Sequence, residues 1–183
     1  PPQTQFLEAN PFHEEAITYT KEHFSHHYGS LNSDFLYPVT FAESKQWLQE
    51  FFKTRFAEFG AYEDAIVAKE NILNHSVLTP MLNVGLLTPQ LIVDEALEYA
   101  SNNQIPLNSL EGFIRQIIGW REFIRGVYEL KGVEERTKNH WGFTRKIPPS
   151  FWTATTGIEP LDMTIQKVLD RGYCHHIERL MVL

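Results

Sequence analysis

A largely apolar stripe with helical spacing runs through residues 41–59, and it constrains the fold more than any other feature of the sequence. Its positions repeat every three or four residues, with charges opposite; they are Phe41, Lys45, Leu48, Phe51, Phe52, Arg55, Phe56 and Phe59. Such a repeat gives a helix one face that must pack against other elements. Core packing accounts for the stripe, and we assign no chemistry to it.

Similar patterns along the rest of the chain predict an almost wholly helical protein, that is, an all-α fold. The predicted helices span residues 12–26, 41–59, 80–88, 90–102, 109–130 and 161–182. Gly60 is expected to end the second of these helices. Asn108 or Ser109 should cap the fifth and Asp162 the sixth, because short polar side chains accept hydrogen bonds from free backbone amides at a helix start.

The composition is that of a globular domain, since 43% of the 183 residues are hydrophobic and 13% are aromatic. The sequence contains no run of 18 apolar residues, so we expect no membrane contact. Cys174 is the only cysteine, which excludes an internal disulfide and favours a reducing compartment. A net charge of −7 argues mildly against a nucleic-acid binder.

Only residues 131–155 have a basic bias, because lysines and arginines there alternate with tryptophans and phenylalanines. Two interpretations are equally favoured by the pattern alone. One is a surface loop held in place by aromatic side chains, and the other is a nucleic-acid contact. Three histidines, His23, His26 and His27, lie close together near the end of the first predicted helix. A solvated helix end is favoured there over a metal site, and we expect no metal.

A short run near the end of the sequence, residues 156–183, brings titratable and basic side chains together. Gly157 and Pro160 indicate a turn before the last predicted helix. If residues 173–183 are helical, His176 and Arg179 share one face, because they are three positions apart. That face then carries a titratable group beside a fixed positive charge.

Two further segments contain groups that could bind an anion or a base. Ser76 and Thr79 precede Pro80, a residue suited to the first turn of a helix, where free amides attract anions. Plain helix capping is favoured over anion binding there by the pattern alone. Trp120 beside Arg121 could form a stacking platform next to a phosphate contact, although a tryptophan in such a stripe is more often part of a core.

Taken together, three motifs resemble the flavin-binding domain of the photolyase/cryptochrome family. The first is T-G-x-x-P-x-x-D followed by G-aromatic-x-H-[HN]-x-x-R, which covers Thr156, Gly157, Asp162, Gly172, His175, His176 and Arg179. The second is S-x-L-[ST]-P-x-L-x-x-G-x-L-[ST]-P at residues 76–89, and the third is WREF at residues 120–123. The piece HHIERLMV at residues 175–182 resembles the prokaryotic photolyase-related branch, whose substrate is the (6-4) photoproduct.

The resemblance implies a helical FAD-binding domain and specifies how much of it is present. Residues 1–40 would be a connector after a missing N-terminal α/β domain, and residues 41–183 would be the first half of the FAD-binding domain. The chain begins with Pro-Pro and ends at Leu183 inside a predicted apolar helix. We therefore expect it to be a fragment, in which an antenna chromophore would belong to the missing domain.

The resemblance also assigns roles to residues. The expected FAD contacts are Tyr62, Ser76, Val77, Leu78, Thr79, Gln116, Trp120, Arg121 and Arg179. The expected lesion contacts are Trp120, Tyr173 and His175. His176 is the expected proton donor, with His175 as the second catalytic residue, since histidine as a residue type titrates near neutral pH.

The chain departs from the family pattern at three positions. Val77 replaces an arginine found in many members, which removes a side-chain contact but leaves backbone contacts possible. Ile117 replaces a glutamate that contacts pyrimidine dimers, which weakens an assignment to that lesion. The place of an iron–sulfur ligand is occupied by Pro160, so we expect no cluster ligand in this chain.

The sequence supports three interpretations of function. The first is a light-driven DNA repair enzyme, a photolyase-like lyase that uses reduced FAD and binds damaged DNA, in the bacterial cytoplasm at the nucleoid. The alternative is a cryptochrome-like flavin photoreceptor without repair activity. The third is a helical fragment that cannot hold flavin, because half of the binding site is absent. The oligomeric state stays open.

Overall fold

Helices are the only regular secondary structure in the part of the chain that the computed structural model describes, residues 2–31 and 36–183. The elements are α1 (Pro11–Phe24), α2 (Phe41–Thr54), the 3-10 helix η1 (Phe56–Glu58), α3 (Phe59–Tyr62), α4 (Thr79–Asn83), α5 (Pro89–Asn103), α6 (Leu107–Thr137), α7 (Ser150–Thr153), α8 (Glu159–Arg171) and α9 (His176–Met181). The all-α prediction is confirmed.

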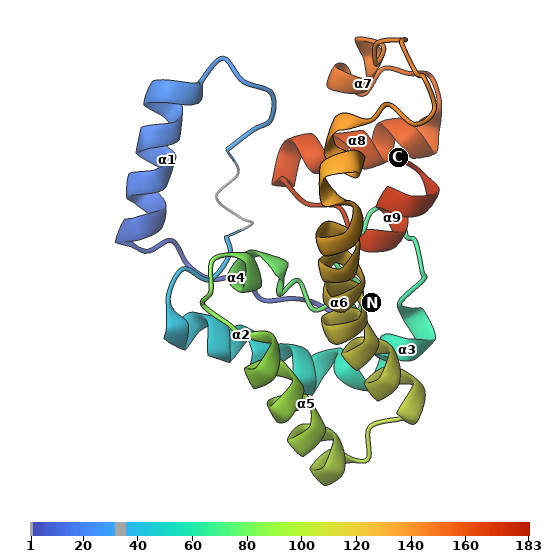
Figure 1. Cartoon of the computed structure of the whole chain (residues 1–183). Helices are drawn as coiled ribbons and strands as arrows, with labels where there is room; N and C mark the ends of the chain where they lie inside the picture. Colours follow the sequence, from blue (N-terminus) through green and yellow to red (C-terminus); the bar gives the residue numbers. More distant parts are fainter. Residues whose placement is uncertain (1, 32–35) are drawn as a thin grey trace.

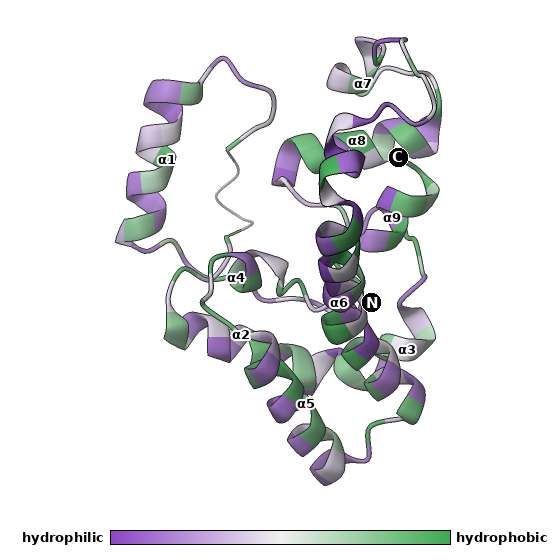
Figure 2. Cartoon of the chain, in the orientation of Figure 1, coloured by the Kyte–Doolittle hydropathy of each residue, from purple (hydrophilic) through white to green (hydrophobic). Residues whose placement is uncertain are grey.

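The hydrophobic core lies where α2, η1, α3 and α5 pack against the first half of α6. In Figure 1, α6 runs through the middle of the molecule, and α2 and α5 lie at its lower end. Figure 2 shows apolar and polar residues alternating along these helices, as expected of amphipathic elements. The centre is aromatic: the rings of Phe51 and Phe113 lie 5.0 Å apart, and Phe52, Phe56 and Phe59 surround them.

The first two helices begin with capping boxes that also hold them to each other. The side chain of Thr40 accepts from the amide of Glu43, and the Glu43 carboxylate accepts from the amide of Thr40. Asn10 forms the equivalent box with His13 at the start of α1. The Asn10 amide nitrogen also donates to Glu43 at 2.9 Å, so the two helix starts are linked. Reciprocal caps satisfy amides that a helix leaves free.

The single helix expected over residues 41–59 is broken at Arg55, which has a non-helical backbone with φ −130°. The break turns the chain so that α3 packs against the start of α6. Gly60 lies inside α3 instead of ending a helix, and a Cβ there would come within 2.5 Å of the Asn108 carbonyl carbon. This close approach requires glycine.

The predicted caps of α6 and α8 are wrong. Pro106 precedes α6, and Ser109 lies inside the helix, where its hydroxyl accepts from the Gly60 amide and donates to the Ala57 carbonyl, both at 2.9 Å. The N-cap of α8 is Ile158. Asp162 instead accepts three hydrogen bonds from Thr156 and Gly157, which fold the preceding turn back onto the helix.

The helix expected over residues 161–182 is also wrong, because it consists of α8 and α9 with a turn between them. Gly172 ends α8 with a left-handed backbone, φ +64°, a conformation that glycine adopts without steric cost. Other helices differ in length from the prediction or were not predicted. The helix expected over 80–88 ends at Asn83, the helix expected over 109–130 continues to Thr137, and the short α7 was not predicted.

The N-terminal segment contacts both ends of the molecule. Phe6 packs against Trp47 of α2, with ring centroids 5.8 Å apart. Beyond α1, which stands apart in Figure 1, the Ser30 amide donates to the carbonyl of Leu169 in α8 at 2.8 Å. Tyr28 stacks on Trp152 of α7 at 5.4 Å. The segment before α1 thus contacts α2, and the segment after α1 contacts α7 and α8.

Candidate functional site

The segment expected to contact flavin, residues 76–79, has a constrained backbone. Val77 has φ +54°, a left-handed conformation that is strained for a β-branched residue. The indole nitrogen of Trp47 donates to the Ser76 carbonyl at 2.9 Å and holds the segment against α2. Val77 and Leu78 are buried, whereas Thr79 is exposed at the first position of α4. Because α4 has only five residues, its contribution to anion binding rests on its free amides.

Directly before this segment, the imidazole of His75 stacks on that of His175. The ring centroids are 4.7 Å apart and the planes are 17° from parallel. Both side chains are buried, with 6% of His75 and 1% of His175 exposed. Burial, followed by the positive charges that His175 and His176 would carry, lowers the pKa of His75 to about 4. Burial also lowers the pKa of His175. Both rings are therefore neutral at neutral pH.

A buried ion pair lies beside the stack. Glu178 of α9 is 1% exposed, and its carboxylate binds the ammonium of Lys167 from α8. The same ammonium donates to the carbonyls of Val67 at 3.2 Å and Glu70 at 2.8 Å. Lys167 thus has three acceptors, which a buried cation needs to offset its lost hydration. We call His75, His175, Glu178, Lys167 and Cys174 the histidine cluster.

Cys174 completes the cluster as a protonated thiol. Its sulfur donates to the second carboxylate oxygen of Glu178, Oε2, at 3.6 Å. Burial, followed by the negative charge of Glu178, raises the pKa of Cys174 to about 12. This thiol is therefore unreactive at neutral pH, since thiolates are the nucleophilic form.

Two buried nitrogens of the cluster have no hydrogen-bond partner among the described residues, Nε2 of His75 and Nε2 of His175. Buried polar atoms are nearly always paired in folded proteins. A ligand with polar atoms at this place would satisfy them. The cluster therefore has the character of a binding site that borders the 76–79 segment.

The structure brings only some of the predicted site residues to this cluster. His175 belongs to it, and Ser76, Val77 and Leu78 follow His75 directly. His176 and Arg179 are exposed on α9, so the two adjacent histidines differ sharply in burial. Tyr173 is partly buried against the core, and burial raises its pKa.

The remaining predicted residues lie on α3 and α6. Tyr62 is 50% exposed and Trp120 is 60% exposed, the latter stacked on Phe123 of the same helix. Gln116 donates to the carboxylate of Glu63 at 2.9 Å. Arg121 donates to the carbonyl of Ile117, within α6. These side chains do not contact the histidine cluster through any interaction that the described residues show.

Sequence reasoning missed the pairing of His75 with His175 and the burial of Glu178. Two signals were present. His75 directly precedes the predicted flavin segment, and Glu178 follows Ile177 within the motif HHIERLMV. Neither signal reveals that α8 and α9 fold back so that Lys167 meets Glu178.

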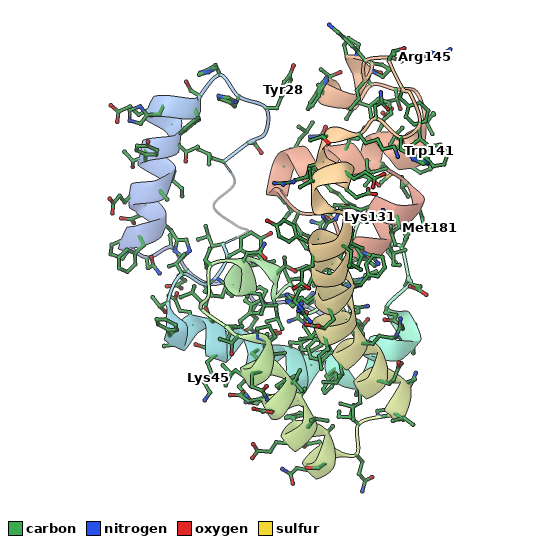
Figure 3. The ribbon with its side chains drawn as sticks, viewed as in Figure 1. Tyr28, Lys45, Lys131, Trp141, Arg145 and Met181 are labelled. Atoms are coloured by element: carbon green, nitrogen blue, oxygen red, sulfur yellow. The ribbon has the colours of Figure 1, made fainter. Side chains whose placement is uncertain are left out.

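The basic segment after α6 is exposed and rich in aromatic side chains. Trp141 and Phe143 are 75% and 74% exposed, and their rings are nearly parallel. Asn139 holds this turn through hydrogen bonds with the backbone of Phe143. Figure 3 shows Trp141 and Arg145 at the end of the molecule that carries α7 and α8.

Residues 2–31 and 36–183 contain neither a candidate metal site nor a candidate membrane-spanning helix. No group of three or more histidine, cysteine, aspartate or glutamate side chains has an arrangement that could hold a metal ion. None of the helices in these ranges is both long and apolar enough to cross a bilayer.

Comparison with known proteins gives two relatives, while no protein-family model matches the chain. The (6-4) photolyase of Agrobacterium fabrum (strain C58 / ATCC 33970) is 35% identical over 168 residues, which cover 92% of this chain and 33% of the photolyase. The uncharacterized protein R853 of Acanthamoeba polyphaga mimivirus is 38% identical over 112 residues, 61% of this chain and 85% of R853. The chain thus spans about a third of the length of the photolyase that it matches. The helical fold agrees with these matches, and the chain belongs to the photolyase/cryptochrome family.

Proposed function

We propose that this chain is the first half of the FAD-binding domain of a light-driven DNA repair flavoprotein acting on the (6-4) photoproduct. One observation carries the proposal: the buried His75–His175 stack, with an unpartnered Nε2 on each ring, borders the segment that resembles the family's flavin-contacting motif. The identity to a (6-4) photolyase supports it. Residues 1–40 are proposed as the connector and residues 41–183 as the domain itself. Such a protein works in the bacterial cytoplasm at the nucleoid.

The residues present fit FAD in two respects. The unpartnered histidine nitrogens match a ligand with polar atoms, and the amides around Ser76, Leu78 and Thr79 suit its diphosphate. We propose Tyr62, Gln116, Trp120, Arg121 and Arg179 as further contacts, with the backbone of Val77 in place of the missing arginine. When bound, reduced FAD supplies light-driven transfer of one electron.

The two adjacent histidines take different roles in this proposal. The exposed side chain of His176 can receive a proton from solvent and deliver it to the lesion. His175 is buried and neutral, so it donates or accepts a hydrogen bond without supplying a net charge. Trp120 and Tyr173 are proposed to line the lesion pocket with His175. The exposed indole of Trp120 can stack on a base.

Damaged DNA is the proposed partner, and residues 138–146 are proposed to contact it. Lys131 and Lys138 both pair with Glu134, which offsets part of their charge. Arg145 and Lys146 are exposed in the same segment as Trp141, so they can reach phosphates while the indole stacks on a base.

The test is repair of a synthetic (6-4) photoproduct by the intact protein with chemically reduced flavin, under near-ultraviolet or blue light. We expect intact thymines in the light and none in the dark. His176→Asn should bind FAD and damaged DNA but lose repair, because asparagine has no titratable proton. His23→Asn, at an exposed site on α1, is the matched control and should repair normally.

Each outcome has one meaning. A wild-type protein that repairs neither (6-4) lesions nor pyrimidine dimers contradicts the repair function. If that protein still shows flavin photochemistry, the photoreceptor alternative replaces it. Equal repair by His176→Asn and wild type removes His176 as the proton donor and leaves the repair function standing.

A further inference from the structure

The groups around His175 define which of its two ring nitrogens carries the proton. The backbone amide of Glu178 donates to Nδ1 of His175 at 3.4 Å, so this nitrogen must present a lone pair. In a neutral imidazole the proton is then on Nε2. Nε2 lies 3.6 Å from Oε2 of Glu178, so the carboxylate faces the proton-bearing nitrogen.

Lys167 determines what the Glu178 carboxylate does to this histidine. Alone, a buried carboxylate beside an imidazole would favour the imidazolium ion. The Lys167 ammonium binds the other carboxylate oxygen, Oε1, and is held by the carbonyls of Val67 and Glu70. The Lys167–Glu178 ion pair therefore has a net charge close to zero. His75 and the protonated thiol of Cys174, which belong to the cluster, add no negative charge to it, and neither does the exposed His176 beside it in sequence.

We propose that Glu178, neutralised by Lys167, is a positioning residue that holds His175 as a neutral imidazole with its proton on Nε2. His175 then keeps that proton on the side of the Glu178 carboxylate and carries no net charge. This separates it from His176, to which the proton transfer is assigned. The inference uses the proposed function only in treating His175 as a site residue.

Nitrogen-15 NMR of the histidine side chains in the intact protein tests the proposal without any repair assay. In wild type at pH 7 we expect the shifts of His175 to show a protonated Nε2 and an unprotonated Nδ1. Lys167→Met leaves the Glu178 carboxylate buried without its counter-charge, so His175 should take up a proton and its pKa should rise by about one unit or more. The double variant Lys167→Met/Glu178→Gln removes both charges and should restore a neutral His175.

Lys45→Met is the matched control, since it breaks a surface ion pair with Glu95 at 3.3 Å and should leave His175 unchanged. The proposal is overturned if wild-type His175 is protonated on Nδ1, or if its titration is the same in wild type and Lys167→Met. The wild-type measurement decides the tautomer even if a variant does not fold. If repair fails but the histidine shifts are as expected, the proposed function is contradicted and this inference stands. If repair is normal but His175 has the other tautomer, this inference is overturned and the proposed function stands.

Discussion

His75 and His175 stack face to face, with ring centroids 4.7 Å apart, although they lie far apart in the sequence. His75 precedes α4 and His175 is the N-cap of α9. The stack joins the two segments in which sequence motifs predict flavin and lesion contacts. Two imidazolium ions would repel each other strongly in this buried geometry, so the arrangement favours neutral rings.

The first prediction concerns acid stability. Burial lowers the pKa of His75 from 6.5 to about 4 in the folded protein. Above pH ~6.5 the imidazole of His75 is neutral in both the folded and the unfolded protein, and the full contribution of His75 to stability is present. Between pH ~6.5 and ~4 the unfolded chain binds a proton that the native protein does not, so the free energy of unfolding falls with falling pH, by about 3 kcal/mol in total.

Urea unfolding at several pH values should show this loss, and it should be smaller in His75→Phe, because phenylalanine can stack but cannot titrate. His175, whose pKa burial also lowers, still contributes in that variant. His23→Gln, at an exposed position, should retain the wild-type pH dependence. A His75→Phe protein that loses as much stability as wild type between pH ~6.5 and ~4 would show that another group is responsible.

The second prediction compares two glycines in helices. A Cβ at Gly60 would lie 2.5–2.6 Å from the backbone of Asn108 and Ser109, so Gly60→Ala must push α3 away from α6. We expect a loss of about 1–3 kcal/mol in the free energy of unfolding. Gly126→Ala meets no atom within 4 Å and should instead stabilise α6 by about 0.5–1 kcal/mol. Chemical denaturation measures both, and equal effects would contradict the close approach.

The third prediction concerns the buried guanidinium of Arg55. Its side chain is 0% exposed and pairs with Glu50 at 2.5 Å and Thr4 at 2.6 Å, below the rings of Trp47 and Phe51. Glu50→Gln leaves this cation without its counter-charge and should lower the free energy of unfolding by about 3 kcal/mol.

The matched control for this prediction is Glu122→Gln, which breaks an exposed pair with Arg125 and should change stability by less than about 0.5 kcal/mol. Thermal or urea unfolding distinguishes the two. A loss for Glu50→Gln no larger than that of the control would contradict the role of Glu50 as the counter-charge that Arg55 requires.

The fourth prediction tests the flavin contact. Thr79 is exposed at the start of α4, and Thr79→Glu places a carboxylate beside the amides proposed to bind the diphosphate. Repulsion should reduce the flavin-to-protein ratio after purification at least about tenfold, since the lost charge interaction is worth more than about 1.4 kcal/mol. Asn102→Glu adds the same charge at the exposed end of α5 and should retain flavin. Normal flavin content in Thr79→Glu would remove this segment from the proposed site.

The sequence predicted the helical class and most helix positions, because amphipathic spacing reports directly on which face is buried. It failed where contacts between distant residues decide the local structure. The break at Arg55 depends on a buried ion pair and on the Gly60 contact with α6, and neither is visible in a window of neighbouring residues. The left-handed backbone of Gly172 separates α8 from α9 and thereby creates the fold that brings Lys167 to Glu178, a contact between residues that are not neighbours in the sequence.

The candidate site was predictable only in part for the same reason. Motif resemblance identified His175 and residues 76–79, and the structure shows that His75, which directly precedes these residues, stacks on His175. It gave no reason to single out His75, whose role depends on its stacking partner in α9. The proposed roles of Trp120, Arg121 and Tyr62 stay predictions, because their described contacts are with their own helices or with solvent.

The hydrogen bonds of Ser30 with the end of α8 have a consequence for how the molecule assembles. Ser30 and Asp170 are 140 positions apart, so their contact closes almost the whole chain into one loop. Closing a loop of that size is entropically unfavourable until the helices between its ends have formed. We therefore expect these contacts to form after the folding transition state, with φ-values near zero. The amide of Ser30 should exchange with solvent through a local opening that leaves the aromatic core folded, so this junction is the first part of the structure to open and the last to close.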